Sequence, residues 1–262
     1  MIQPFFYVFL FVAGAIGGFF SGLLGIGGGI IMFPLLLYLP PILGFDAIGV
    51  KNITGLTMIQ GFFASLSAIL FYNKERLINK SLALTLGLSL FITSLLGSLI
   101  SKGVSDSYLL FIFGILALVA SVLMFIPRSY MKDDLTEDKV DFHKPTAILT
   151  GIFIGFLLGM VGQGGAFIII PILLYVLKIP LRVALGSTLA IGLFSATAGL
   201  VGKIATGQVP FYMAGALLLG AIPSARIGGI VSKKTKIKFL RWILALIISA
   251  TAIKVWYDIF LD

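Results

Sequence analysis

The sequence has no cysteine and few charged residues. Charged side chains make up 11% of its 262 residues, whereas an ordinary globular domain is about one quarter charged. Hydrophobic residues account for 59% of the chain, and the mean hydropathy is +1.14. The absence of cysteine excludes disulfides, thiolate metal sites and a thiol nucleophile. The low charge and high hydropathy indicate a multi-pass protein of the cell membrane.

Groups that could perform catalysis inside a membrane are also scarce. The single histidine is His143, in a polar stretch, and the ten acidic residues lie near segment ends, in that stretch or at the C-terminus. Neither a G-x-S-x-G nor an H-E-x-x-H motif occurs. We therefore expect no enzymatic activity, no metal site and no cofactor. A proton relay of buried carboxylates is not expected, but coupling to substrate-borne H+ or to Na+ held by unwound backbone stays open.

Two glycine-rich stretches reveal an internal repeat. Gly25-Ile26-Gly27-Gly28-Gly29 precedes an apolar run, and Gly162-Gln163-Gly164-Gly165-Ala166 precedes a similar one. At an offset of 137, residues 14–38 and 151–175 match at 12 of 25 positions. The chain therefore consists of two copies of one unit, and such repeats set the architecture. We assign residues 1–127 to the first copy, 146–262 to the second, and 128–145 to a polar linker.

Each copy contains five apolar segments. A spanning helix needs about 20 apolar residues, so the third, fourth and fifth segments of each copy are long enough, and the second is too short to cross alone. The first two form either a re-entrant hairpin or a broken helix pair whose first member spans. The expected fold is all-α, with segments at roughly 5–24, 28–40, 46–72, 78–101, 105–127, 146–161, 164–177, 181–203, 209–232 and 236–260.

The distribution of Lys and Arg predicts the topology. A formal charge of +9 could suggest nucleic acid, but 14 of the 19 cations fall on one face if each copy is a hairpin plus three spans. The positive-inside rule assigns this face, with the linker, to the cytoplasm and both termini to the outside. The two copies then have opposite orientations. Inverted repeats with broken helices are typical of secondary transporters.

The glycine stretches are candidate anion sites. Adjacent glycines are poor helix formers, and unwound backbone in a membrane must be buried in protein or line a wet cavity. The helix that follows begins with N–H groups free of intrahelical partners and with the positive end of its dipole. Two such termini could face one anion; the alternative is a tight turn without ligand. The residues expected there are Gly25, Gly27, Gly28, Gly29, Gln163, Gly164, Gly165 and Ala166.

The same stretches resemble the signature of the TauE/SafE sulfite-exporter family of membrane permeases. The resemblance rests on residues 25–36, on their echo at 162–173, and on Ala184-Leu185-Gly186-Ser187-Thr188-Leu189-Ala190. It extends over nearly the whole chain and implies transport of sulfite or small organosulfonate anions. The chain departs from the family pattern at Ala166, which replaces a glycine, and at Lys51-Asn52, where small residues and Ser or Thr are more usual.

Neutral polar residues in the third segments are candidates to line the anion cavity. Neutral donors suit an oxyanion, although hydroxyls also bond to their own helix carbonyls. We select Asn52, Thr54, Gln60, Ser187 and Thr188.

Three cations are possible gate or vestibule residues. Lys51 and Lys203 lie near the outer ends of the third segments, where they either snorkel at the rim or attract anions into a vestibule. Arg226 lies inside a helix, where it either snorkels or contacts the anion at a cytoplasmic gate.

The sequence therefore predicts a secondary transporter that moves a small sulfur-containing anion by alternating access. A passive anion channel and a non-transporting membrane scaffold are the alternatives. The expected partners are a small anion and the lipid bilayer, without nucleic acid. Nothing in the sequence sets the oligomeric state.

Overall fold

The computed structural model describes residues 4–74, 78–125, 142–162 and 166–261, and every regular element in these ranges is a helix. Ten α-helices coincide with the ten expected apolar segments, which confirms the all-α fold. A short 3-10 helix, η1 (Ser101–Gly103), follows the fourth. The α-helices are α1 (Pro4–Leu24), α2 (Gly29–Ile42), α3 (Val50–Lys74), α4 (Lys80–Ile100), α5 (Asp106–Phe125), α6 (Lys144–Val161), α7 (Ala166–Tyr175), α8 (Leu181–Ala205), α9 (Phe211–Lys234) and α10 (Ile237–Leu261).

Seven helices of the described residues are long and apolar enough to cross a membrane. They are α1, α4, α5, α6, α8, α9 and α10. The first helix of each copy is thus long enough to span, whereas α2 and α7 have only 14 and 10 residues. Of the two arrangements considered for the first two segments, the helix lengths favour a spanning helix followed by a shorter one.

Helix boundaries repeat along the chain. The helices α8, α9 and α10 begin 131 residues after α3, α4 and α5, whereas α7 begins 137 residues after α2. The six-residue difference has two sources: α7 is four residues shorter than α2, and the connection that follows it is two residues shorter. This register pairs Gly55 with Gly186 and Thr57 with Thr188. The two copies therefore share their helical framework as well as the glycine motif.

The first helix of each copy packs on the fourth helix of the other copy. α1 lies along α9, and α6 lies along α4. A Cβ atom at Gly18 would collide with backbone of Ala221, and one at Gly155 would approach backbone of Leu90. These two contacts correspond by the 137- and 131-residue offsets. Glycines at this spacing let helix backbones approach closely in a membrane, so the copies are interlocked through their glycine faces.

The central helix of the fold is α8. Its residues from Val183 to Ile191 are all buried, and it contacts α3, α4, α6 and α7. α3, its counterpart, packs on α8 and α9. The two third helices therefore meet at the centre, where they can position side chains toward both glycine turns.

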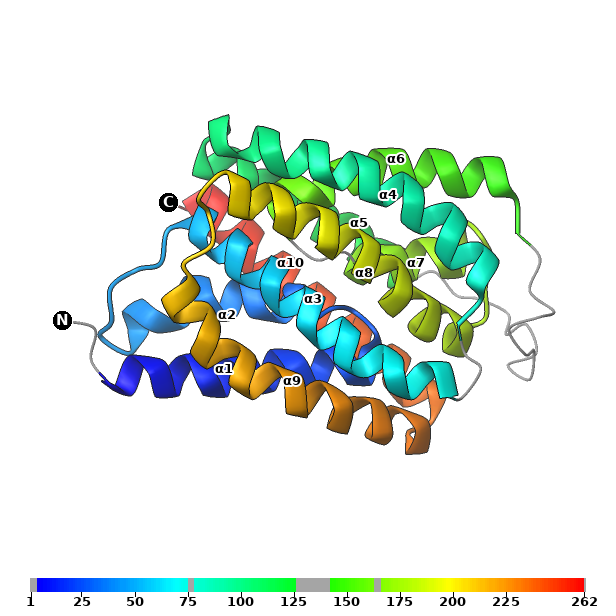
Figure 1. The fold of residues 1–262 in the computed structure, drawn as a ribbon, viewed down its shortest axis with the longest axis horizontal. Helices are drawn as coiled ribbons and strands as arrows, with labels where there is room; N and C mark the ends of the chain where they lie inside the picture. The colour runs from blue at the N-terminus through cyan, green and yellow to red at the C-terminus, as the bar shows by residue number, and fades with distance from the viewer. Residues whose placement is uncertain (1–3, 75–77, 126–141, 163–165, 262) are drawn as a thin grey trace.

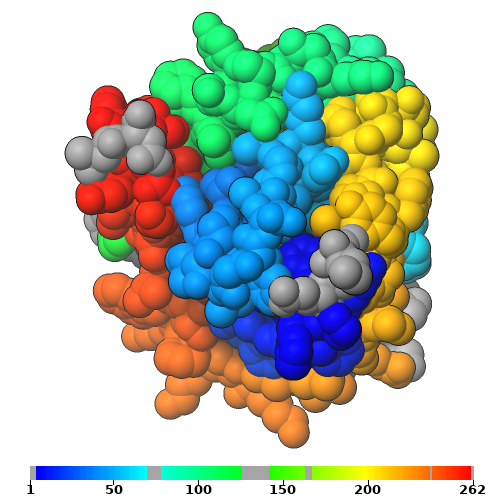
Figure 2. All heavy atoms as spheres, turned by 90° about the vertical axis from the view of Figure 1, so that its left-hand side faces the viewer, coloured from blue at the N-terminus to red at the C-terminus, as the bar shows by residue number. Residues whose placement is uncertain are grey.

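The helices run roughly along one axis, and both ends of the described chain lie at the same end of it (Figure 1). In that view α1 runs from left to right and α6 from right to left, so the two copies start in opposite directions. Figure 2 looks at the end that carries the termini. The segment after α2 lies at the centre of this face, with parts of α1, the region around α5 and the region around α9 surrounding it.

Candidate functional site

The first glycine stretch is a left-handed turn between α1 and α2. Gly25, Gly27 and Gly28 have φ of 67°, 65° and 76°, values that L-residues rarely adopt. Space is restricted as well, because a Cβ atom at Gly25 would collide with the Leu185 carbonyl. One at Gly28 would lie 2.6 Å from Gln60 Nε2. Backbone conformation and close packing thus both require glycine here.

The turn leaves a row of backbone donors at the start of α2. The N–H groups of Ile31 and Met32 bond to the Gly28 carbonyl at 3.2 and 3.0 Å. The N–H groups of residues 27–30 have no hydrogen-bond partner among the described residues. These four free N–H groups lie at the positive end of the α2 dipole, where negative charge is favoured.

The Gln60 side chain of α3 lies beside this turn. It is fully buried, and neither Oε1 nor Nε2 has a partner among the described residues. Its Nε2 lies 3.5 Å from where a Cβ of Gly17 would be, so the amide faces both α1 and the turn. Ser21 Oγ, one turn beyond Gly17 on the same face of α1, is likewise buried and unpartnered. A buried polar group without a partner costs about 1–3 kcal/mol, so a ligand that bonded these atoms would stabilise the protein.

The second glycine stretch is held by α3. Gly162 ends α6 with φ of 71°, and its carbonyl accepts a hydrogen bond of 2.6 Å from Thr57 Oγ1. A Cβ at Gly162 would collide with the Thr54 carbonyl. Gly25 and Gly162, and likewise Leu185 and Thr54, occupy corresponding positions in the two copies. Gln163, Gly164 and Gly165 lie outside the described residues, and Ala166 is described only as the first residue of α7.

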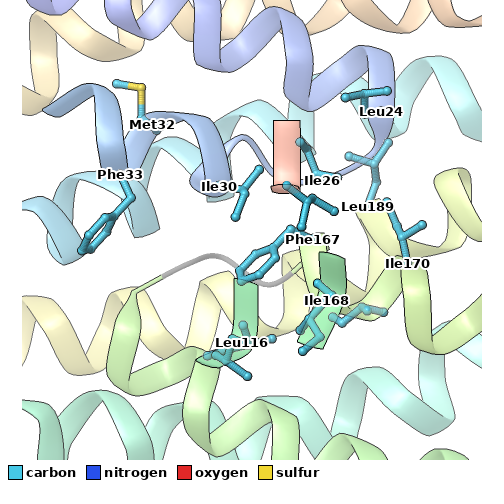
Figure 3. Close-up of a cluster of buried hydrophobic side chains, with 14 of the residues drawn as sticks. Leu24, Ile26, Ile30, Met32, Phe33, Leu116, Phe167, Ile168, Ile170 and Leu189 are labelled. Atoms are coloured by element: carbon cyan, nitrogen blue, oxygen red, sulfur yellow. The ribbon is translucent and has the colours of Figure 1, made fainter. Parts of the chain in front are cut away.

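Apolar side chains lie between the two turns. Figure 3 shows Ile26 of the first turn and Ile30 of α2 facing Phe167 of α7. All three are buried. Phe113 of α5 contacts Phe167 with ring centroids 6.0 Å apart. The arrangement in which both helix N-termini face a single anion therefore stays a prediction. The free N–H groups of the first turn and the unpartnered Gln60 amide lie next to one another.

Thr54, Ser187 and Thr188 are buried, but each has a partner within the protein. Thr54 Oγ1 donates to the Lys51 carbonyl at 2.7 Å, and Thr188 Oγ1 donates to the Ala184 carbonyl at 2.5 Å. Ser187 Oγ accepts from the Asn79 N–H at 3.0 Å and so fixes the start of α4. These contacts match the alternative in which hydroxyls serve the protein's own backbone.

Asn52 is separate from the first glycine turn. It lines a surface cleft of about 410 Å³ at the end of the bundle that carries the termini, beside Asp46 and Tyr212. The structure therefore places Asn52 in an outer cleft, away from the buried and unpartnered side chains of Gln60 and Ser21.

Lys203 is not at a rim, contrary to the snorkelling expectation. Its side chain is fully buried, and Nζ donates to Thr54 Oγ1 at 2.9 Å and Ser101 Oγ at 2.7 Å. It also reaches the Met160 carbonyl at 3.1 Å and Gln208 Oε1 at 3.0 Å. The expectation was wrong because η1 and the segment after α8 fold over the end of α8, which sequence position alone does not reveal.

The other two cations do not face the glycine turns. Lys51 Nζ donates to the Lys102 carbonyl at 2.8 Å, at the protein surface. Arg182, which corresponds to Lys51 in the second copy, similarly reaches the Thr235 carbonyl at 3.4 Å. Arg226 is exposed on α9, which fits snorkelling and not a gate contact. Both cations at the starts of the third helices thus bind carbonyls at the turns after the fourth helices.

Four polar residues of this region were not selected from the sequence as site residues: Ser21, Thr57, Ser101 and Gln208. Two of them, Ser101 and Gln208, lie at helix ends that resemble ordinary surface loops. Their burial depends on which elements meet there. Among the described residues, no group of three or more His, Asp and Glu side chains is placed to hold a metal ion.

Comparison with known proteins identifies the class of molecule. Residues 10–255 match the family described as sulfite exporter TauE/SafE, and the chain belongs to this family. A probable membrane transporter protein of Bacillus subtilis, YunE, is 23% identical over 96% of this chain and 98% of its own length. A probable membrane transporter protein of Methanocaldococcus jannaschii is 28% identical over 91% of each chain. One from Xylella fastidiosa is 29% identical over 93% of this chain and 92% of its own length.

No solved structure matches significantly. The family and the names of the relatives agree with a multi-pass membrane transporter. The apolar helices fit a bilayer environment.

Proposed function

We propose that this protein is a secondary transporter for a small sulfur-containing anion, sulfite or an organosulfonate. The single observation that carries the proposal is the Gln60 carboxamide. It is fully buried, has no partner among the described residues, and faces the Gly28 turn at the N-terminus of α2. The sulfur-containing class comes from the description of the family.

The chemistry of this cluster suits an oxyanion. Free backbone N–H groups at a helix start donate hydrogen bonds, and the helix dipole adds positive potential. The Gln60 amide and the Ser21 hydroxyl add neutral donors. A sulfur oxyanion presents several acceptor oxygens to such a set. Because the site is enclosed, each hydrogen bond is stronger than in water.

The arrangement of the copies supports alternating access as the mechanism. α1 and α6 run in opposite directions in Figure 1, and glycine contacts such as Gly18 with α9 and Gly155 with α4 are exchanged between the copies. We propose that the copies are inverted repeats that rock against each other, as in other secondary transporters. The cation distribution supports a cytoplasmic linker and extracytoplasmic termini.

Flux into liposomes tests the proposal. Purified protein is reconstituted and uptake of sulfite, taurine, sulfoacetate, thiosulfate and sulfate is measured against empty liposomes. We expect saturable uptake of at least one sulfur-containing anion, and loss of that uptake in Gln60→Leu. Uptake that rises linearly without saturation indicates a passive channel. Rates equal to empty liposomes for every anion would sink the proposal.

A further inference from the structure

Lys203 is an ionisable residue buried inside the protein, and none of the described residues gives it a negative partner. Its side chain is fully buried in α8, and the four oxygen atoms around Nζ belong to a threonine, a serine, a glutamine and a backbone carbonyl. Among the described residues it forms no ion pair. Buried charges are normally paired, and an ionisable residue inside a membrane protein is a functional candidate by default.

The orientation of the hydroxyl groups shows that the surroundings are built for an ammonium group. Thr54 Oγ1 already donates its proton to the Lys51 carbonyl at 2.7 Å, and Ser101 Oγ donates to the Ser98 carbonyl at 2.6 Å. Both hydroxyls therefore present lone pairs to Lys203. The Gln208 amide is oriented the same way, because its Nε2 donates to Thr206 Oγ1 at 2.7 Å and its Oε1 accepts from Lys203.

The charge lies next to the second glycine turn. The Met160 carbonyl, which accepts from Lys203 at 3.1 Å, precedes the turn residue Gly162 by two positions. Thr54 links the two as well, since its hydroxyl accepts from Lys203 and its backbone abuts Gly162. In the first copy the corresponding position holds Tyr72. The second turn therefore has a lysine beside it, and the first copy has no cation at the corresponding position.

We propose that Lys203 determines the charge selectivity of the transport site. Its ammonium group, held behind the second glycine turn by neutral acceptors, attracts an anion to the turns and disfavours neutral molecules of the same shape. The inference rests on the proposed function and adds to it a specificity residue in the second copy. This role differs from that of a vestibule lysine at the rim. The ammonium group is enclosed by protein and attracts the anion through its electrostatic field, without direct contact.

Binding of a charged and a neutral ligand of the same shape tests the inference. The purified full chain in detergent is titrated with methanesulfonate and with dimethyl sulfone, its uncharged isostere, and binding is measured by calorimetry. We expect wild-type protein to prefer methanesulfonate. Lys203→Met should weaken methanesulfonate binding roughly tenfold, because the anion loses the attraction of a nearby charge in surroundings of low dielectric constant, and leave dimethyl sulfone binding unchanged.

A second variant covers the case in which Lys203→Met does not fold. Ser101→Asp keeps the lysine and places a carboxylate beside its ammonium group. The carboxylate neutralises the positive charge, and Lys203 Nζ still donates hydrogen bonds to the oxygen atoms around it. We expect the same loss of preference for the anion. Lys102→Met, a neighbouring exposed lysine, and Ser94→Ala, which removes a buried hydrogen bond to the Ser195 carbonyl, are the controls for charge and for stability.

The outcomes separate this inference from the proposed function. Wild-type preference for methanesulfonate in both Lys203→Met and Ser101→Asp overturns the inference and leaves the transporter proposal standing. An equal loss in Ser94→Ala also overturns it, since the effect would then be structural. If wild-type protein binds none of sulfite, taurine or methanesulfonate, the proposed function and the inference both fail.

Discussion

Thr57 of α3 donates a 2.6 Å hydrogen bond to the carbonyl oxygen of Gly162, at the end of α6. The bond joins the third helix of the first copy to the glycine turn of the second. Gly25 of the first turn in the same way abuts Leu185 of α8. Each turn is therefore positioned by the opposite copy. A movement between α3 and α8 would therefore displace both turns at once.

Replacing Gly25 with alanine should destabilise the protein. A side chain there needs φ near 67° and collides with the Leu185 carbonyl. The backbone conformation alone costs about 1–2 kcal/mol. We expect a lower melting temperature in detergent for Gly25→Ala. The control is Gly215→Ala, where the added Cβ meets nothing within 4 Å and helix propensity gains up to about 1 kcal/mol. Equal melting temperatures for Gly25→Ala and wild type would contradict the described turn.

Replacing Gln60 with leucine should separate stability from function. The buried amide without a partner costs about 1–3 kcal/mol, which the leucine removes. We therefore expect Gln60→Leu to melt at a higher temperature without substrate and to lose anion uptake. Leu56→Met, on the same buried helix, should change neither property. A variant that melts lower and still transports at the wild-type rate would argue that Gln60 serves packing alone.

A cysteine pair should cross-link the two copies through α5 and α10. Ser121 Oγ and Ser249 Oγ lie 2.8 Å apart, close enough for side chains of cysteines at these positions to meet. Because the chain has no cysteine of its own, an intramolecular disulfide in the double variant is detectable without background. We expect protease treatment in the linker to leave one band under oxidising conditions and two after reduction. Two bands in both conditions would contradict this helix pairing.

Labelling of single cysteines should establish which end faces the cytoplasm. Gly103→Cys lies in η1, in open space, and Thr235→Cys follows α9. From the cation distribution we expect a membrane-impermeant reagent to label position 103 in intact cells and position 235 only after permeabilisation. The reverse pattern would invert the proposed topology while leaving the fold unchanged.

Much of the fold could be predicted from the sequence, because its signals are local. Apolar segment length and the glycine motif located all ten helices. Gly14, Gly18 and Gly22 lie four residues apart in the sequence, a spacing that is typical of close helix contact in a membrane. It did not indicate that the partner would be α9 of the other copy, since any helix with small residues satisfies that spacing. Contacts between distant segments depend on topology, which a single sequence specifies only through the combined packing of all helices.

The site was predicted less completely for the same reason. Gln60 was selected from the sequence because an amide is hard to satisfy in apolar surroundings, and the structure places it beside the first turn; that it lines an anion cavity stays a prediction. Lys203 was misplaced. A lysine two residues from a helix end ordinarily reaches water, but here Ser101 and Gln208 come from two other segments to enclose it. Whether Lys203 is enclosed depends on where η1 and the segment after α8 lie in the fold. Neither segment carries a local sequence motif that would predict this.

The exchange of first helices between copies also imposes an order on biosynthesis. α1 leaves the ribosome first among the described helices, but its glycine face belongs against α9, which begins only after about four fifths of the chain has been made. α6, by contrast, finds α4 already inserted. During translation α1 must therefore remain in the membrane with its glycine face toward lipid or the insertion machinery. Packing of α1 against α9 is consequently a late step of folding, because it requires that α9 has been synthesised and inserted.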